Sequence, residues 1–371
     1  MAKLKVWKFF SVWMVLVLVV GLGAALVPAS QVTAIGVPAT LYVSKWTEYA
    51  TNPVFDPVAK AYYPTVVKVS DTDYRMWYGS DSGIGYATSS DGLTWAEVQN
   101  PVTGLTNANH PLVEYINGKY RMWYWAGNSV LYSINAIRYA DSTDGITWEN
   151  DQAISGNIIT GSDGDWNNGS YGPIDVLHNP TATNTGTNPF DYSFAMYFDG
   201  TTGGFEEIGL GYSPDGISWS LYGKVLARGN GGPWGNTDDW DSSYTTFGTI
   251  IKEADGRWHM WYSGGQEDSN DGIGYAYSSD GLNWVRDASN PIMHQNDGVS
   301  WRANRTYTPV VIKDGGVYKM WFSGMATDNY AMLSAMPPQM AHSHQFSPLS
   351  MPPLPVTPST WRRGHITKTY Q

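Results

Sequence analysis

The sequence predicts an all-β protein, a five-bladed β-propeller, and three observations carry this prediction. The composition is rich in strand-forming rings and in turn formers, with 18 Trp, 25 Tyr and 40 Gly among 371 residues and only 15% charged residues. A strand-like motif centred on Met-Trp-Tyr recurs along the chain, and a Ser-x-Asp-Gly turn with a following Trp recurs behind it. Such internal repetition indicates one supersecondary unit copied several times.

The Met-Trp-Tyr motif predicts the second strand of each unit. Its copies are "YRMWYG" (74–79), "YRMWYW" (120–125), "FAMYFD" (194–199), "WHMWYS" (258–263) and "YKMWFS" (318–323). Their methionines stand 46, 74, 64 and 60 residues apart, which suits one four-stranded sheet plus variable loops. Rings occupy both alternating faces of these strands, so each sheet is expected to be covered on both sides.

Three further strands complete each unit. A short β-branched run precedes every copy: "YYPTVVK" (62–68), "NHPLVEY" (109–115), "YGPIDVL" (171–177), "TFGTIIK" (246–252) and "YTPVVIK" (307–313). A third strand such as "GIGYATS" (83–89) follows, then the Ser-x-Asp-Gly turn and a fourth strand that begins at Trp95, Trp148, Trp219 or Trp284. Four strands in each of five units give the five-bladed propeller.

The fifth unit lacks the turn and its Trp-led fourth strand. The segment "KWTEYATNPVF" (45–55) resembles "TWAEVQNPV" (94–102) and "NWVRDASNPIM" (283–293), which are fourth strands of other units. We therefore expect the N-terminal segment to supply the outer strand of the last blade, so that the ring closes without an unpaired edge.

The two ends of the chain differ from the repeats. Residues 1–34 carry three lysines, an apolar run from Phe9 to Leu26 and small residues before possible cleavage sites after Ala29 or Ala34, which predicts a signal peptide and export. An uncleaved N-terminal membrane anchor is the alternative. Residues 35–336 are predicted to form the propeller. Residues 337–371 are rich in Pro and Ser and predict a disordered tail, or a frameshifted end of the reading frame.

Charge and cysteine content exclude several classes of function. The chain has no Cys, which excludes disulfides, a thiol nucleophile and Cys-ligated zinc. Its net charge of −11 falls to −14 without the leader and to −17 without the tail, so nucleic acid is not expected as a partner. We expect no cofactor, no metal, no membrane contact after signal cleavage, and a monomer.

Two acidic features look like metal or catalytic sites. The segment "GGQEDSNDG" (264–272) lacks the spacing of a calcium loop and is interpreted as a solvated loop. The turn residues Asp91, Asp144, Asp215 and Asp280 lie on the face opposite the expected mouth of the channel. Asp folds back on a turn backbone while Gly takes the positive φ, so these four are interpreted as structural.

Candidate ligand-binding residues gather before the first strands, at the expected mouth. His110 precedes the strand proline of the second unit, and Trp166, Trp240 and Trp301 precede the first strands of units three to five. The Trp rings are expected to stack on sugars, with Arg302, Arg305, Asp165, Asp239 and Asp241 hydrogen-bonding hydroxyls. The alternative is that these Trp rings fill the seams between blades and that His110 lines the channel. Other polar candidates are Glu114, Asp175, Asp199, Glu206, Glu207, Asp268 and Asp271.

The pattern M-W-Y … I-G-Y-A-x-S-x-D-G-x-x-W … N-P, present at 74–102 and 258–292, resembles the arabinanase, levansucrase and invertase superfamily of five-bladed propellers. The chain is most similar to bacterial proteins allied to glycoside hydrolase families 43 and 32, over roughly residues 40–336. The resemblance implies glycoside hydrolysis or transfer by a carboxylate base or nucleophile, a carboxylic acid and an auxiliary Asp near the starts of the inner strands.

The chain departs from that pattern where the acids are expected. The positions before the strand proline, or its equivalent, hold Tyr63, His110, Gly172, Phe247 and Thr308. The sequence therefore predicts that an active protein uses Asp175 and Asp241 as its catalytic pair, with Asp239 and Asp165 as further candidates. The expected function is an exported hydrolase that acts on a poly- or oligosaccharide at the mouth. The alternatives are a propeller that binds a glycan or a protein without catalysis, and a calcium-stabilised structural propeller.

Overall fold

The computed structural model describes residues 46–57, 60–127, 136–162, 164–229, 239–266, 271–326 and 330–336. The predicted leader (1–34) and tail (337–371) and the candidate Asp268 lie outside these ranges. The described part contains β-strands and short 3-10 turns such as η2 (Pro189–Asp191) and η4 (Ser300–Arg302), with no α-helix. The prediction of an all-β protein is confirmed. No helix in these ranges is long and apolar enough to cross a membrane.

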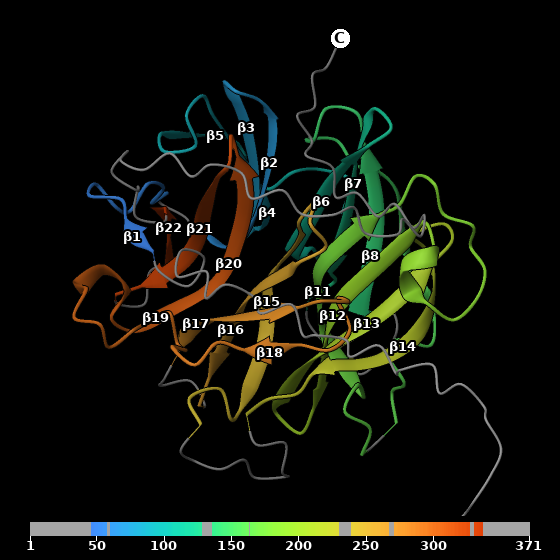
Figure 1. Cartoon of the computed structure of the whole chain (residues 1–371). Helices are drawn as coiled ribbons and strands as arrows, with labels where there is room; N and C mark the ends of the chain where they lie inside the picture. Colours follow the sequence, from blue (N-terminus) through green and yellow to red (C-terminus); the bar gives the residue numbers. More distant parts are fainter. Residues whose placement is uncertain are drawn as a thin grey trace, which may run out of the picture. The chain divides into compact units, whose positions relative to one another are not determined.

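The strands pair as five antiparallel groups (Figure 1), each beginning with one of the predicted β-branched runs. The first group is β2 (Tyr62–Ser70), β3 (Asp73–Ser80), β4 (Gly83–Ser89) and β5 (Trp95–Gln99), and the second is β6 (Asn109–Ile116), β7 (Lys119–Trp125), β8 (Ile137–Ser142) and β9 (Glu149–Ala153). The third is β11 (Gly169–His178), β12 (Phe194–Thr202), β13 (Phe205–Ser213) and β14 (Ser218–Leu226), with β10 (Ser155–Gly156) parallel to β14.

The fourth group is β15 (Tyr244–Lys252), β16 (Trp258–Gly265) and β17 (Gly272–Ser278), with β18 (Val285–Arg286) and β19 (Met293–His294) both pairing β17. One parallel pair, Glu206 with Tyr244, joins it to the third group. The fifth is β20 (Arg305–Asp314), β21 (Val317–Met325), β22 (Tyr330–Met336) and β1 (Thr47–Glu48). Thr47 pairs with Met336 and Glu48 with Ala335, so the predicted pairing of the N-terminal segment with the last unit is confirmed.

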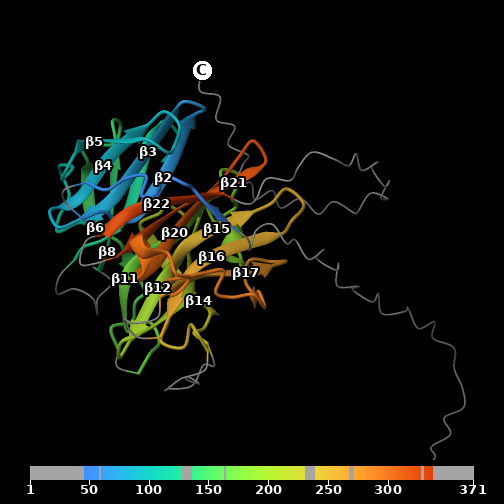
Figure 2. The ribbon, with the colours of Figure 1, turned by 90° about the vertical axis from the view of Figure 1, so that its left-hand side faces the viewer.

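The hydrophobic core lies between successive sheets. Trp77 and Met122 belong to one cluster shared by the first and second sheets, and Tyr74 and Trp321 belong to another shared by the first and fifth. The first strands contact one another in the order β2, β6, β11, β15 and β20, and β20 contacts β2. Figures 1 and 2 show the blue sheet of β2 to β5 beside the second sheet and beside the orange-red strands of the fifth. Both faces of each sheet are therefore buried, as the two-sided apolar pattern predicts.

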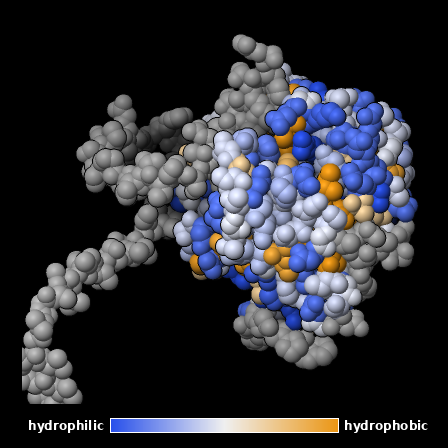
Figure 3. Space-filling model, turned by 90° about the vertical axis from the view of Figure 1, so that its right-hand side faces the viewer, coloured by the Kyte–Doolittle hydropathy of each residue, from blue (hydrophilic) through white to orange (hydrophobic). Residues whose placement is uncertain are grey.

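The outer surface is mixed in character. Large exposed hydrophobic residues in the described part lie one in each of the first, third, fourth and fifth strand groups: Val98, Tyr222, Val285 and Val317. On the face in Figure 3, hydrophobic residues lie scattered among hydrophilic ones. Scattered exposure of this kind is ordinary for a protein surface.

The Ser-x-Asp-Gly turns are structural, as predicted. Asp91 Oδ1 accepts hydrogen bonds from the backbone N–H groups of Leu93 (2.8 Å) and Thr94 (2.7 Å), and Asp144, Asp215 and Asp280 repeat this geometry. The N–H donors, first that of Thr94, lower the pKa of Asp91. Gly92 follows with a φ of 77°, which a side chain rarely adopts.

A hydrogen bond across each of four seams explains why the motif and the turn repeat together. The ring N–H of Trp77 donates to Gly145 O of the next sheet at 2.7 Å, and Trp123 donates to Gly216 O at 2.7 Å. Trp321 of the fifth sheet donates to Gly92 O of the first at 2.7 Å. Tyr197, which replaces Trp in the third copy, donates its hydroxyl to Gly281 O at 2.7 Å.

The change Trp123→Phe tests these seam bonds. It removes the seam donor of the buried Gly216 carbonyl, which keeps the bond from Trp219 Nε1 within its own sheet (3.0 Å). Trp148→Phe is the matched control because Trp148 Nε1 is buried without a hydrogen-bond partner in the described part of the chain. We expect Trp123→Phe to lower the free energy of unfolding by about 0.5 to 1.5 kcal/mol more than Trp148→Phe in urea denaturation. Equal losses would mean that ring volume, not the seam bond, sets the stability.

Candidate functional site

The first strands share an unusual backbone feature at the positions where acids were sought. Each has a β-bulge there, and the bulge residue has a positive φ: Tyr63 (50°), His110 (46°), Gly172 (131°), Phe247 (20°) and Thr308 (54°). Bulky residues with positive φ are strained and concentrate at functional sites. The five bulges thus mark one end of the sheets as a place to look for a site.

Three bulge side chains meet as a ring cluster. The ring centroids of Tyr63 and His110 lie 3.5 Å apart, those of Tyr63 and Phe247 4.6 Å, and those of His110 and Phe247 5.1 Å. His110 Nδ1 donates to the Tyr171 carbonyl at 2.7 Å. Burial lowers the pKa of His110 to about 3, so its imidazole is neutral at physiological pH. The candidate His110 is therefore a hydrogen-bonded member of this cluster.

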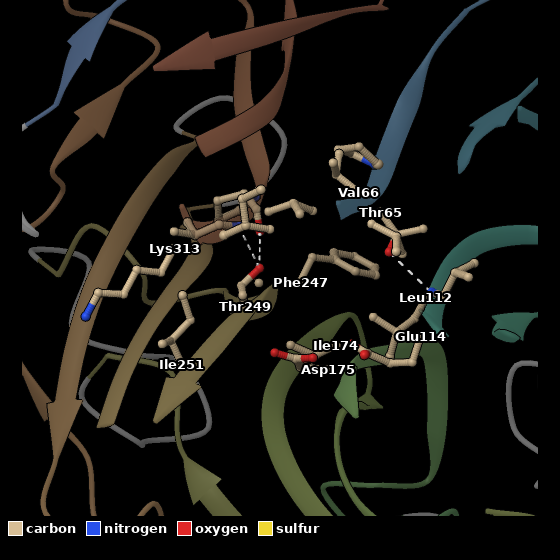
Figure 4. Close-up of a pocket in the computed structure, with 18 of the residues that line it drawn as sticks. Thr65, Val66, Leu112, Glu114, Ile174, Asp175, Phe247, Thr249, Ile251 and Lys313 are labelled. Carbon is tan, nitrogen blue, oxygen red and sulfur yellow. Dashed lines mark hydrogen bonds between the residues drawn. The ribbon is translucent and has the colours of Figure 1, made fainter. Parts of the chain in front are cut away.

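A cavity with a volume of about 710 Å³, called here the central cavity, begins at this ring cluster. Residues from β2, β6, β11, β15 and β20 line it together with the β15–β16 turn. Its walls are mostly aliphatic, with Thr65, Glu114 and Asp175 among the polar groups. Figure 4 shows the carboxyl groups of Glu114 and Asp175 pointing toward one another.

The candidate Asp175 holds two sheets together. It is 2% exposed, and its Oδ2 accepts a hydrogen bond from Ile250 N on β15 at 2.6 Å. The Thr65 hydroxyl likewise accepts a hydrogen bond from Val113 N on the next first strand (3.2 Å), and the Thr249 hydroxyl accepts one from Val311 N (3.1 Å). Asp175 thus occupies the position at which other first strands carry Thr, a placement that favours a role in linking β11 to β15.

The smaller cavity, called here the mouth pocket, lies on the other side of the ring cluster and shares Tyr63 and Phe247 with the central cavity. Its volume is about 350 Å³. It is lined by Tyr63, Tyr171, Gly203, Gly204, Phe205, Glu206, Ser243, Tyr244, Thr246, Phe247, Ser263, Arg305 and Tyr307. Six aromatic side chains surround one carboxyl group and one guanidinium group.

Glu206, which lines the mouth pocket, is one of a pair of hydrogen-bonded carboxyl groups, and its partner Asp199 lies behind the pocket lining. Asp199 on β12 is fully buried and shares a hydrogen bond with the half-buried Glu206 on β13. Asp199 also accepts from Thr246 Oγ1 (2.5 Å) and Tyr171 N (3.2 Å). Burial raises the pKa of Asp199 to about 6, and burial together with the charge of Asp199 raises the pKa of Glu206 well above its usual value. The two carboxyls therefore share a proton near neutral pH.

Arg305, one of the predicted ligand-binding residues, is the basic residue among those that line the mouth pocket. Its guanidinium is bonded to the fully buried Asp271 and lies over the ring of Tyr307 at 4.7 Å. Arg302, in contrast, is buried away from both cavities and pairs with Glu48 (2.7 Å) and Asp297 (3.1 Å). Arg302 therefore ties the N-terminal segment to the fifth sheet.

The three candidate Trp residues pack within the sheets. Trp166 lies against Phe198 at 5.8 Å between ring centroids, where Gly200 and Gly209 leave room for its ring. Trp240 lies 5.8 Å from Tyr262 and Trp301 6.5 Å from Phe322. None of the three lines either cavity. Their ring contacts are those expected under the alternative prediction, in which the Trp rings fill seams.

The remaining predicted carboxylates also lie away from the two cavities. Asp241 is 2% exposed and accepts from Tyr262 OH (3.0 Å) and Arg286 Nε (2.8 Å). Asp239 is half-buried, and Asp165 is exposed in a turn. Of the predicted catalytic pair, Asp175 lines the central cavity and Asp241 lines neither cavity. In the described part, no three His, Asp or Glu side chains group as a metal site.

Asp199 and Glu206 were among the further candidates, but the sequence does not single them out. A signal is present in the repeat itself. The third copy, "FAMYFD", ends in Asp199, whereas the other copies end in Gly, Trp or Ser. Glu206 follows after a Gly-Gly turn, and the β12–β13 hairpin brings the two together by pairing Thr201 with Glu206.

Comparisons with known proteins place the fold. No family model matches the chain. It is 35% identical over 135 residues to the uncharacterized proteins MT1551 and Rv1502 of Mycobacterium tuberculosis, a match over 31% of this chain and 43% of each relative. The match thus spans less than half the length of these curated relatives.

Solved structures similar to this chain include a glycoside hydrolase (TM-score 0.57, 18% identity, 82% of this chain and 95% of that chain). Another is a structure titled for GH130 enzymes that target β-1,2-mannosidic linkages in Candida mannan (0.57, 17%, 80% and 95%). A third is an endo-1,4-β-xylanase of Bacteroides thetaiotaomicron (0.53, 16%, 76% and 90%). The fold is therefore glycoside hydrolase-like.

The change Asp199→Asn tests the shared proton. Because the folded-state pKa of Asp199 is raised, the folded protein holds a proton that the unfolded chain releases, and stability falls as pH rises from about 4 to about 6. Removing the buried charge is expected to raise the free energy of unfolding by about 1 to 3 kcal/mol more at pH 7.5 than at pH 4.5. Urea denaturation at both pH values measures this, with Asp165→Asn as the exposed control. An equal effect at both pH values would contradict the shared proton.

Proposed function

We propose that the protein is an exported five-bladed β-propeller that binds a poly- or oligosaccharide in the mouth pocket. The pairing of β1 with β22 and the contact of β20 with β2 support closure of the five sheets into one ring. The leader at 1–34 supports export. The proposal treats the protein as a monomer, since each sheet already has a neighbour on both faces.

The observation that carries the proposal is the lining of the mouth pocket. Tyr63, Tyr171, Phe205, Tyr244, Phe247 and Tyr307 surround Glu206 and Arg305. Rings stack on the apolar faces of sugars, and a few charged groups fix the orientation of hydroxyls. The similarity in fold to glycoside hydrolases is consistent with a carbohydrate ligand, although the fold alone does not define a ligand.

Binding without hydrolysis is favoured by where the carboxyl groups lie. Hydrolysis needs two carboxyls about 5 Å apart for retention, or roughly 6.5 to 9.5 Å apart for inversion, on either side of the bond. Asp199 and Glu206 are hydrogen-bonded to each other, which leaves no room for a glycosidic bond between them. The five bulge positions carry no acid.

Hydrolysis is the second candidate function, and one observation favours it. Glu206 lines the mouth pocket with a raised pKa, the state of a general acid at neutral pH. The pair Asp175 and Asp241 stays a prediction for this case, although both side chains are buried and hydrogen-bonded.

Calorimetry and product analysis on arabinan, xylan, fructan and mannan oligosaccharides test these functions. For the proposed function we expect saturable binding of at least one sugar, no turnover, and at least tenfold weaker binding in Tyr307→Ala, which removes one stacking ring. Tyr222→Ala, at an exposed ring on β14, is the matched control.

Turnover abolished by Glu206→Gln would favour the second candidate, and turnover abolished by Asp175→Asn or Asp241→Asn would assign the predicted pair. Neither binding nor turnover on any sugar would contradict the proposal.

A further inference from the structure

The carboxyl pair of the mouth pocket is only partly compensated by a cation, because the charge of Arg305 lowers the pKa of Glu206 while burial and Asp199 keep that pKa well above its usual value. Asp199 bonds to the Thr246 hydroxyl, the Tyr171 N–H and Glu206, and no cation is among these three partners. The one guanidinium that lines the pocket, that of Arg305, is bonded to the carboxylate of Asp271. The buried carboxyl pair keeps a proton because two adjacent negative charges are costly in a low dielectric.

The charges just behind the pocket wall do not supply that cation either. Glu207 forms an ion pair with Lys224 at 2.8 Å, with its other oxygen accepting from Arg228 N at 3.3 Å. The Arg228 guanidinium lies over the Phe205 ring at 3.6 Å. Lys224 thus offsets the charge of Glu207, and the Arg228 guanidinium is held over the Phe205 ring. The space inside the pocket, next to Glu206, is therefore where an added positive charge is best compensated.

The pocket lining adds a second, independent feature that suits a cation. Six aromatic side chains line a volume of about 350 Å³, room for one or two sugar units. Aromatic faces carry negative potential and attract an ammonium group, most strongly where water is excluded. Rings around a carboxylate form the arrangement with which proteins recognise organic cations.

We propose that the mouth pocket recognises a protonated amine carried by an amino sugar of the glycan, and that the amine takes the place of the proton shared by Asp199 and Glu206. This inference rests on the proposed function and names its ligand class. The ammonium N–H donates to the Glu206 carboxylate, and the displaced proton leaves to solvent. No covalent bond forms or breaks in the sugar.

A metal ion and an acidic sugar fit the pocket less well. Calcium prefers six to eight oxygen ligands, whereas rings make up much of this lining and no metal-binding group of three acidic or His side chains occurs in the described ranges. A uronate would face Glu206, while Arg305 is already engaged by Asp271. Neutral sugars can stack on the rings, but they bring no positive charge to replace the proton that Asp199 and Glu206 share.

Titration calorimetry of the purified full chain with β-1,4-linked glucosamine tetramer, and with its N-acetylated counterpart as the neutral match, tests the inference. We expect the amine form to bind at least tenfold more tightly at pH 6.5. In buffers that differ in ionisation enthalpy, we expect release of close to one proton per bound amine. The affinity is expected to fall on acidification below the pKa of Asp199, about 6, because both carboxyls then hold protons.

Two variants test whether the preference for the amine comes from the carboxyl pair or from the negative charge of the surface in general. Glu206→Gln is expected to abolish both the preference for the amine and the proton release. Asp165→Asn, which removes an exposed carboxylate, is expected to change neither. Proton release by the unmodified protein needs no variant, so the test holds even where a substitution harms folding.

The outcomes distinguish this inference from the proposed function. Neutral oligosaccharides that bind as tightly as the amine, without proton release, would overturn the inference and leave the proposed function intact. Failure of every saccharide to bind would overturn both. Saturable displacement of the amine by calcium chloride, at constant ionic strength, would assign the carboxyl pair to a metal ion and overturn the inference.

Discussion

The seam between successive sheets is the constraint on which the rest of the structure depends. Each sheet is apolar on both faces and is buried only when a neighbour lies on either side. Packing alone does not fix register, because aliphatic and aromatic faces slide at small cost. The Trp-to-glycine-carbonyl bonds add direction: Trp77, Trp123 and Trp321 each anchor to the turn of the adjoining sheet. These seams bring the starts of all five first strands to one place.

Much of this arrangement is predictable from the sequence because it repeats. The strands follow from the copies of the Met-Trp-Tyr motif, and the pairing of β1 with β22 follows from the likeness of 45–55 to other fourth strands. The structural role of Asp91 and its counterparts follows from turn chemistry. Repetition supplies several independent copies of each local signal, so one degraded copy does not hide it.

The site was harder to predict because it depends on details that do not repeat. In β11 a second register shift, beyond the one at Gly172, falls between Pro173 and Asp175 and places Asp175, rather than Ile174, opposite Tyr197. This register makes Asp175 of β11 equivalent in position to Thr65 of β2, which lies opposite Trp77. The role of the Trp residues before the first strands could not be predicted from the sequence, because Trp suits both stacking on a sugar and filling a seam between sheets.

The residue at the last position of three Met-Trp-Tyr copies accepts backbone hydrogen bonds, and these copies differ in whether that residue carries a charge. Ser323 accepts the N–H of the bulge residue Tyr63 (3.2 Å), and Ser263 accepts that of Thr308 (2.6 Å). Asp199 stands at the same position but accepts the N–H of Tyr171 on β11 of its own sheet, whereas the two serines each hold the bulge residue of the next sheet. At those two seams a hydroxyl is sufficient to hold the bulge.

The equivalent serines make their contacts without a charge, whereas burial of the Asp199 carboxylate works against stability. Glu206 beside it increases that cost, because a second carboxyl must share the same proton. The other Met-Trp-Tyr copies end in Gly, Trp or Ser. Only the third copy ends in an acid, Asp199, and there the hairpin turn brings a second acid, Glu206, to the wall of a pocket. Such a local cost, confined to one sheet and one cavity, is the physical mark of a binding site rather than of a scaffold position.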